Sequence, residues 1–224
     1  EPQILHQHIE FVGIPNVSHD TPNVLRNAEH LLGMLTKRGI SAKLLEVPDA
    51  PPLVYGELLQ PGAPSTYVFY GHYDGQPVDP KEWATPPFEP TLRDARLEKG
   101  GKIVSLPPPG ESLNPDWRLY ARAAADDKAP IMAMLAALDA LQSVGIQPRA
   151  NLKFVFDGEE EIGSPNLARL LRAHRGLLQA NLWIICDGPE HPSGRQTIVF
   201  GVRGVQGLEI TVYGANRELH SGHY

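Results

Sequence analysis

The stretch FVFDGEEEIGSP, residues 154–165, runs an apolar segment directly into a cluster of acidic side chains. The four carboxylates at positions 157 and 159–161 would repel one another unless a cation lay among them. Adjacent glutamates at the end of a strand can divide two tasks, because one can bind a metal ion while its neighbour serves as the general base for a metal-activated water. The alternative is a solvated charged loop, and the compact, uncharged continuation IGSP argues against it.

A second candidate is the pair His72 and Asp74, two positions apart in GHYDGQP. His72 could bind a metal through one ring nitrogen while Asp74 accepts a hydrogen bond from the other, which would fix the tautomer of the ring. The alternative is a loop histidine followed by an aspartate that turns the chain before Gly75. The motif alone leaves both interpretations open.

Further acidic residues stand at the predicted ends of helices and strands. Asp126 and Asp127 lie where a helix begins, and Asp187 follows the apolar run WIIC. Each has an ordinary explanation, because aspartate caps helices and occupies turns. A carboxylate at the helix start could also bridge two cations, with Lys128 as a local counter-charge. Imidazole and carboxylate ligands without thiolates suit zinc, manganese or cobalt.

The spacing of apolar residues predicts strands that alternate with helices. The predicted strands are 67–70, 151–156 and 181–186, and the predicted helices are 21–39, 128–145 and 166–176. For the first helix, Thr21 is the expected N-cap, Pro22 the first helical residue and Gly39 the end. This order indicates the α/β class, with a mainly parallel sheet flanked by helices. In such sheets functional residues gather beyond the carboxyl ends of the strands, where His72, the glutamates and Asp187 fall.

The pattern changes near residue 200, which predicts a second domain. The segment TIVFGVRGVQGLEITVYG, residues 197–214, predicts a strand, a glycine-rich turn and a strand, without a following helix. We therefore expect one domain over 1–200 and the beginning of a second, α+β domain over 201–224. Residues 91–119 have the composition of a long surface insertion with one short hairpin.

The composition restricts the classes of partner. The chain has 224 residues, of which 42% are hydrophobic and 21% charged, with a net charge of -6. It lacks a basic run that would favour nucleic acid, and no stretch approaches the roughly 18–20 apolar residues of a membrane span. A single cysteine, Cys186, excludes an internal disulfide and favours the reducing cytoplasm. The first residues show no signal peptide, and the sequence leaves open whether one was removed.

Five motifs occur in the order and rough spacing of one peptidase family. They are GHYDGQP, ARAAADDKAP, DGEEEIGS, ICDGPE and RELHSGHY. With these motifs the chain resembles the M20 family of co-catalytic metallopeptidases, and most closely its dipeptidase branch, which includes the carnosinase-like enzymes. The resemblance covers essentially the whole chain.

The resemblance implies a set of metal ligands. Two divalent ions, zinc or alternatively manganese or cobalt, would share Asp126 as a bridge. His72 and Asp187 would complete the site of one ion. Glu161 would bind the other ion.

The resemblance also implies the residues that act around the metals. Glu160, which with Glu161 forms the glutamate pair directly before x-Gly-Ser, would be the general base that activates a metal-bridging water. Asp74 would be the hydrogen-bond partner of His72. His220, in LHSGH, would be the histidine of a lid domain that reaches the active site of a partner subunit and polarises the scissile carbonyl.

Two departures from the family pattern concern the turn and the lid. The family commonly has glycines where this chain has Ala121, Ala123 and Ala129. The family also has a complete lid and a return to the catalytic domain that supplies a final histidine ligand, and we expect this sequence to stop early in the lid. His223 is not expected to replace that ligand, because it lies beside His220.

The resulting expectation is a binuclear metal-dependent hydrolase that cleaves peptide or amide bonds of dipeptides or similar small substrates. In its full-length form it would be a homodimer joined through the lid, with no nucleic-acid or membrane partner. The alternative is a catalytically incompetent fragment that folds and binds metal or a partner without turnover. A third interpretation, a flavodoxin-like nucleotide or phosphate binder, lacks a glycine-rich phosphate loop after the first strand.

Overall fold

The computed structural model describes residues 2–106, 108, 111–188, 191–204 and 206–222. The chain divides into two compact units, Glu1–Asp187 and Gly188–Tyr224, which are described separately below. The expected domains, 1–200 and 201–224, stay a prediction.

Among the residues that the structure describes, the helices and strands lie in the first unit. The helices are α1 (Pro2–Val12), α2 (Thr21–Lys37), α3 (Lys128–Ser143) and α4 (Leu167–Ala173). The strands are β1 (Ser41–Leu45), β2 (Leu53–Leu58), β3 (Thr66–His72), β4 (Thr91–Arg93), β5 (Arg118–Tyr120), β6 (Asn151–Asp157) and β7 (Leu182–Ile185). Among the described residues, none of the helices is both long and apolar enough to span a bilayer.

Five strands form one sheet in the order β1-β2-β6-β3-β7. Strand β3 runs parallel to β6 and β7, whereas β1, β2 and β6 are joined by antiparallel pairings. The predicted α/β class is confirmed, but the sheet is mixed. A short connection, residues 46–52, joins β1 to β2, and a connection of this length allows an antiparallel hairpin but not a parallel crossover.

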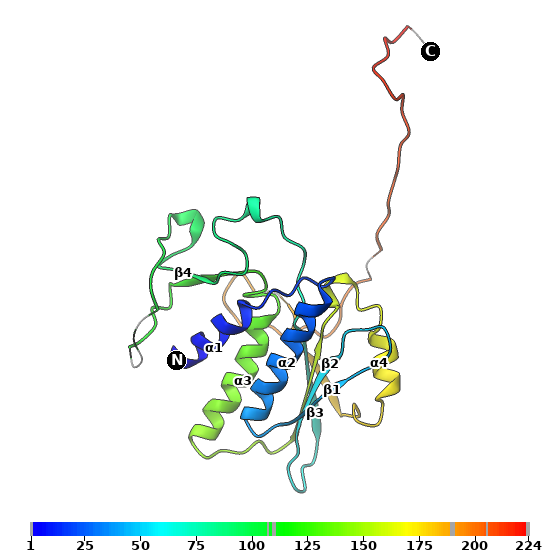
Figure 1. Cartoon of the computed structure of the whole chain (residues 1–224). Helices are drawn as coiled ribbons and strands as arrows, with labels where there is room; N and C mark the ends of the chain where they lie inside the picture. Colours follow the sequence, from blue (N-terminus) through cyan, green and yellow to red (C-terminus); the bar gives the residue numbers. More distant parts are fainter. Residues whose placement is uncertain (1, 107, 109–110, 189–190, 205, 223–224) are drawn as a thin grey trace. The chain divides into compact units, whose positions relative to one another are not determined.

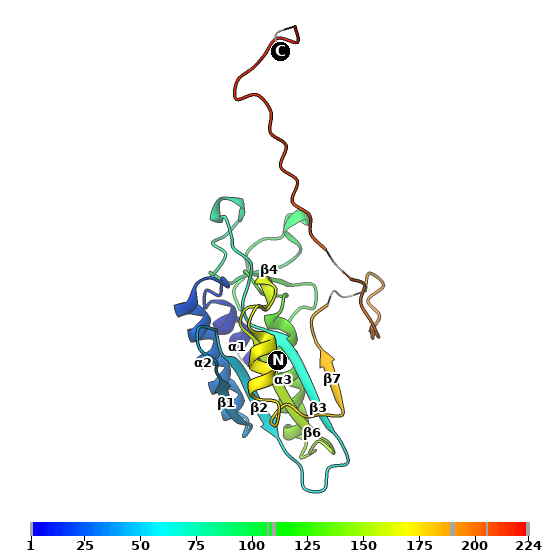
Figure 2. The same ribbon diagram turned by 90° about the vertical axis from the view of Figure 1, so that its right-hand side faces the viewer.

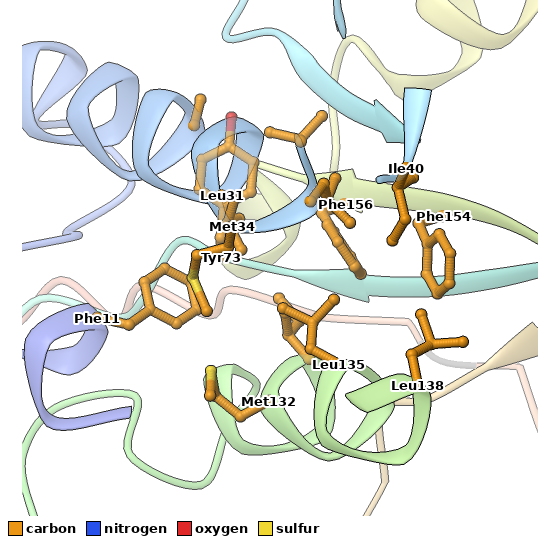
Figure 3. Packing of buried hydrophobic residues seen from close by; sticks show 14 of the residues in the cluster. Phe11, Leu31, Met34, Ile40, Tyr73, Met132, Leu135, Leu138, Phe154 and Phe156 are labelled. Carbon is orange, nitrogen blue, oxygen red and sulfur yellow. The ribbon is translucent and has the colours of Figure 1, made fainter. Parts of the chain in front are cut away.

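Helices cover both faces of this sheet, with α1, α2 and α3 on one face and α4 on the other (Figures 1 and 2). On the three-helix face, Leu135 and Leu138 of α3 pack against Phe154 and Phe156 of β6 (Figure 3). On the α4 face, Leu170 packs with strand residues that include Val155. Successive residues of β6 therefore serve two separate cores, and the strand is buried on both sides.

The start of α2 differs from its prediction. Asp20 is the N-cap, and its side chain accepts hydrogen bonds from the backbone and side-chain nitrogens of Asn23, at 3.3 and 2.7 Å. Thr21 is already helical, so Pro22 follows the first helical residue. An aspartate is at least as good a cap as a threonine, which explains the shift by one residue. The helix ends as predicted before Gly39, whose φ of 75° suits glycine.

Two segments outside the main sheet were also predicted. In the surface insertion, β4 and β5 pair antiparallel, but residues 94–117 lie between them, so the expected short hairpin is instead a long excursion closed by two strands. In the second unit the predicted strands over 197–214 are absent from the described residues, which are exposed and form neither helix nor strand. That part of the prediction is wrong for this structure, and the reason is that two strands alone bury too little apolar surface to be stable in water.

Candidate metal centre

The carboxyl ends of three parallel strands bring the predicted site residues to one edge of the sheet. His72 is the last residue of β3 and pairs in register with Asp157, the last residue of β6. Strand β7 ends at Ile185, two residues before Asp187. Parallel strands end on the same side, and the residues that follow them meet there.

His72, Asp126 and Asp187 converge at this edge. Each offers a ligand atom, and these atoms lie within 4.8 Å of one another. The His72 Nε2 atom lies 3.0 Å from Asp126 Oδ1 and 3.8 Å from Asp187 Oδ2. The predicted convergence of these three residues is therefore present in the structure. A carboxylate oxygen of Glu160 also lies 3.8 Å from Nε2.

Asp74 lies behind the histidine ring, on the side away from this group. Its Oδ1 lies 3.2 Å from His72 Nδ1, although the contact lacks the geometry of a full hydrogen bond. The same carboxylate accepts hydrogen bonds from the backbone nitrogens of Glu160 and Glu161, both at 3.1 Å, and from the Ser18 hydroxyl at 2.7 Å. Asp74 thus connects the histidine to the glutamate turn.

The electrostatics of the group favour a cation at His72. Burial lowers the pKa of the ring, but the close carboxylate of Asp74 and the charges of Asp127 and Glu160 outweigh it and raise the pKa to about 10. The carboxylates therefore favour a positive charge at this position. One imidazole nitrogen and two carboxylates within coordinating reach are also a donor set that suits a divalent ion such as zinc. The residues present fit a metal.

Asp127 is a contributor that the sequence left undecided. Its side chain is buried, and Oδ2 accepts a hydrogen bond from the backbone nitrogen of His72 at 3.0 Å. Burial raises the pKa of this carboxyl to about 7. A Cβ atom on Gly71 would lie 2.7 Å from the same oxygen, so this contact requires a glycine beside the histidine. In this pair, Asp126 therefore lies among the candidate metal ligands, whereas Asp127 bonds to the backbone of His72.

The acidic run divides in the same way. Glu159 is buried, and its carboxylate accepts hydrogen bonds from the backbone and side chain of Asn166, at 2.6 and 3.1 Å. Asp157 is buried and accepts hydrogen bonds from the hydroxyls of Ser164 and Tyr70, at 2.7 and 3.2 Å. Protein donors thus compensate these two carboxylates, whereas Glu160 and Glu161 begin a short 3₁₀ helix at the edge of the site.

Glu161 lies outside the group of three mutually close ligands. Its Oε2 accepts a hydrogen bond of 2.7 Å from the side-chain amide of Gln76, which also donates to the backbone oxygen of Glu161 at 3.2 Å. Both bonds hold Glu161 against Gln76. The predicted role of Glu161 as a ligand stays a prediction.

Lys128 does not act as the expected counter-charge. Its buried ammonium donates to the backbone oxygens of Phe11 and Ile14 and to the side-chain oxygen of Asn27, at 2.7, 3.2 and 2.7 Å. The charge is therefore directed toward the end of α1 and not toward the aspartates. The sequence placed the lysine correctly but could not show the direction of its side chain.

His220 belongs to the second unit, where it is exposed and its Nδ1 accepts a hydrogen bond from the backbone nitrogen of Gly222 at 3.2 Å. Its role at an active site stays a prediction. His223 lies outside the described residues.

Comparisons with known proteins identify the family of the chain. The sequence profile described as "Peptidase family M20/M25/M40" matches residues 68–220. The "Cys-Gly metallodipeptidase dug1" of Schizosaccharomyces pombe is 30% identical over 94% of this chain and 43% of its own length. The human "Beta-Ala-His dipeptidase" is 28% identical over 77% of this chain and 30% of its own.

A solved structure of an M20 family enzyme has a similar fold. The M20 family metallo-carboxypeptidase Sso-CP2 from Sulfolobus solfataricus superposes with a TM-score of 0.69 and 31% identity, over 86% of this chain and 39% of that chain. The chain spans less than half the length of the curated relatives that it matches.

Proposed function

Since the chain belongs to the peptidase family M20/M25/M40, we propose that it forms the metal-binding part of a dipeptidase that uses two divalent ions. The substrates are dipeptides or similarly small amides. The observation that carries the proposal is the convergence of His72, Asp126 and Asp187 within 4.8 Å, with the Glu160 carboxylate beside them. Two relatives whose names identify them as dipeptidases support the substrate class.

The first ion would be held by His72, Asp126 and Asp187. The second would be held by Glu161 together with Asp126. When bound, the metals supply Lewis-acid polarisation of the scissile carbonyl and lower the pKa of a water. Asp74 would keep the His72 ring oriented so that Nε2 faces the metal position. We propose zinc, with manganese and cobalt as alternatives, because the donors are imidazole and carboxylate without thiolate.

Glu160 would move the proton. Its carboxylate takes a proton from the water whose oxygen bonds to the carbonyl carbon, and then gives that proton to the amine nitrogen as the carbon–nitrogen bond breaks. The products are a carboxylic acid and an amine. Glu160 suits this role because its backbone is fixed by Asp74 while its side chain stays partly exposed at the group.

The remaining features of the proposal are the partner subunit, the class of substrate and the location. We propose that His220 polarises the substrate carbonyl in the site of a partner subunit, in a homodimer joined through the lid. The net charge of -6 favours small-molecule substrates over nucleic acid. The single cysteine supports the cytoplasm as the location.

The experiment is a pair of isosteric variants, Glu160→Gln and Glu161→Gln, studied by zinc titration and by hydrolysis of Cys-Gly and β-Ala-His. Glu160→Gln should keep the zinc affinity and lower turnover by roughly 10²–10⁴-fold, because it removes only the base. Glu161→Gln should bind one of two zinc ions more weakly, because it removes a charged ligand.

Hydrolysis at the parent rate by Glu160→Gln would assign the base to another residue. If the parent protein binds zinc but hydrolyses no dipeptide, the alternative of a metal-binding fragment without turnover would replace the proposal. If the parent protein binds no zinc, the metal centre itself is wrong.

A further inference from the structure

We propose that Ser18 is a positioning residue for the metal centre, acting through Asp74 on both His72 and the glutamate turn. The inference rests on the proposed function, since it assigns a role toward the metal that His72 would bind. It comes from the loop between α1 and α2, residues 13–20, which none of the five sequence motifs includes.

This loop is docked against the backbone that carries Asp74. The backbone nitrogen of Ser18 donates to the oxygen of Gly75 at 3.1 Å, and Val17 forms a parallel bridge with Gly75. The side-chain amide of Asn16 donates to the backbone oxygen of Tyr73 at 2.9 Å. Ser18 is therefore held next to Asp74 by several independent contacts.

The hydroxyl of Ser18 has one proton and two acceptors within reach. Asp74 Oδ2 lies at 2.7 Å and the Gly75 oxygen at 3.1 Å. The Gly75 oxygen already accepts from the Ser18 backbone nitrogen, whereas the carboxylate is charged and closer. A carboxylate accepts a hydrogen bond from a hydroxyl more strongly than a carbonyl does, so the Ser18 hydroxyl donates to Asp74.

Donors approach both oxygens of Asp74. The Glu160 nitrogen and His72 Nδ1 face Oδ1, while the Glu161 nitrogen and the Ser18 hydroxyl face Oδ2. Ser18 and Asp74 are 5% and 0% exposed, so water does not readily replace a lost hydroxyl. Without Ser18 the carboxylate loses its shortest contact and can rotate. That rotation would disturb the His72 ring and the backbone before the two glutamates together.

The test compares zinc affinity in Ser18→Ala and Ser18→Thr with that of the parent protein, by competition with a chromogenic chelator. Ser18→Ala should bind zinc about 3–10-fold more weakly, less than the roughly 10–100-fold that follows loss of a direct partner of a metal-ligating histidine, because Ser18 acts one contact further away, through Asp74. Ser18→Thr keeps the hydroxyl and should stay within about threefold of the parent. If Ser18→Ala fails to fold, Ser18→Cys, which offers only a weak donor, takes its place in the comparison.

Asn151→Ala is the matched control. Asn151 is the first residue of β6, at the end of the strand away from Asp157, and its side chain bonds to Gln60 and Thr66. Its loss should lower the melting temperature by about 2–4 °C, as for Ser18→Ala, yet leave zinc affinity unchanged.

The outcomes separate the two proposals. Zinc binding by Ser18→Ala within twofold of the parent, or an equal loss in Asn151→Ala, would overturn the role of Ser18. No zinc binding by the parent protein would instead count against the proposed function.

Discussion

Ala123 adopts a backbone conformation that side chains usually avoid. Its φ is 60°, in the left-handed region, and it lies in the turn that leads to Asp126. The resemblance to the family implies glycines around this turn, where this chain has Ala121, Ala123 and Ala129. Of the three, Ala123 alone has a positive φ among the described residues. The turn that leads to Asp126, a proposed metal ligand, thus contains a strained alanine.

This strain predicts that Ala123→Gly stabilises the protein by about 0.5–1 kcal/mol, because glycine relieves the left-handed alanine by more than it adds to the entropy of the unfolded chain. Ala129→Gly is the control, since Ala129 lies inside α3, where glycine should cost about 0.5–1 kcal/mol. Urea unfolding of both variants measures the difference. Equal destabilisation by the two substitutions would show that position 123 carries no strain.

At the residue scale, the sequence predicted the residues that carry charge at strand ends. His72, Asp126 and Asp187 could be found because each follows or precedes a predicted element and matches a motif. Ser18 and Asp127 could not, since their roles depend on a hydroxyl and a carboxylate that bond to groups more than fifty positions away. No periodicity or motif encodes such contacts.

At the scale of elements, α1 is attached to the rest of the unit by a buried charge. Lys128, the first residue of α3, donates to the backbone oxygens of Phe11 and Ile14 at the end of α1. The same ammonium lies 4.4 Å from the centre of the Phe11 ring. Burial lowers the pKa of this lysine well below its usual value.

Lys128→Met should therefore loosen α1. The substitution keeps the length of the side chain but leaves buried oxygens without their donor, which we expect to cost about 2–4 kcal/mol. Hydrogen–deuterium exchange should show the largest increase in the amides of α1.

Lys153→Met is the matched control for that experiment. Lys153 is also buried and donates to the backbone oxygens of Leu177 and Gln179, at 2.6 and 2.9 Å. Its loss should increase exchange near residues 177–180 and not in α1. If α1 responds equally to both substitutions, the effect is a general loss of stability and Lys128 is not a specific attachment.

The helices and strands with a clear apolar periodicity were the ones that the sequence predicted. Helices α2, α3 and α4 and strands β3, β6 and β7 were predicted, because their apolar residues recur clearly along the chain. Strands β1 and β2 were not predicted. Strand β2 contains Gly56, where a Cβ would lie 3.0–3.1 Å from Ile40 and Leu35, so this glycine reflects close tertiary packing that a strand pattern does not reveal.

At the scale of the whole molecule, the chain consists of two units of unequal structure. The first unit, Glu1–Asp187, contains the cores and all the proposed metal ligands. The described residues of the second unit expose large apolar side chains, among them Phe200 at 97% and Tyr213 at 92%. Exposed segments without secondary structure are the preferred sites of proteolysis.

Limited digestion with chymotrypsin should therefore cut first after Phe200 and Tyr213. The product, residues 1–200, should keep the zinc affinity of the undigested chain, because His72, Asp126, Glu161 and Asp187 all lie in it. Intact mass and metal content measure both results. A first cut within residues 1–187, or loss of zinc from the trimmed product, would contradict this division of the chain.

Strands β3, β6 and β7 run in the same direction. Loop length therefore affects the positions of the proposed ligands at one end of the sheet and not at the other. The loops 59–65 and 144–150 lie before β3 and β6, are largely exposed and contain no proposed ligand. A peptide tag inserted at Gly62 or Gly145 would lengthen the chain without moving any of the ligands. At the other end, Gly158 is so close to Tyr73 that a Cβ at this position would overlap the Tyr73 hydroxyl. Related sequences should therefore vary in length at the first end, while at the second a single inserted residue would displace the side chains that are proposed to bind the metal.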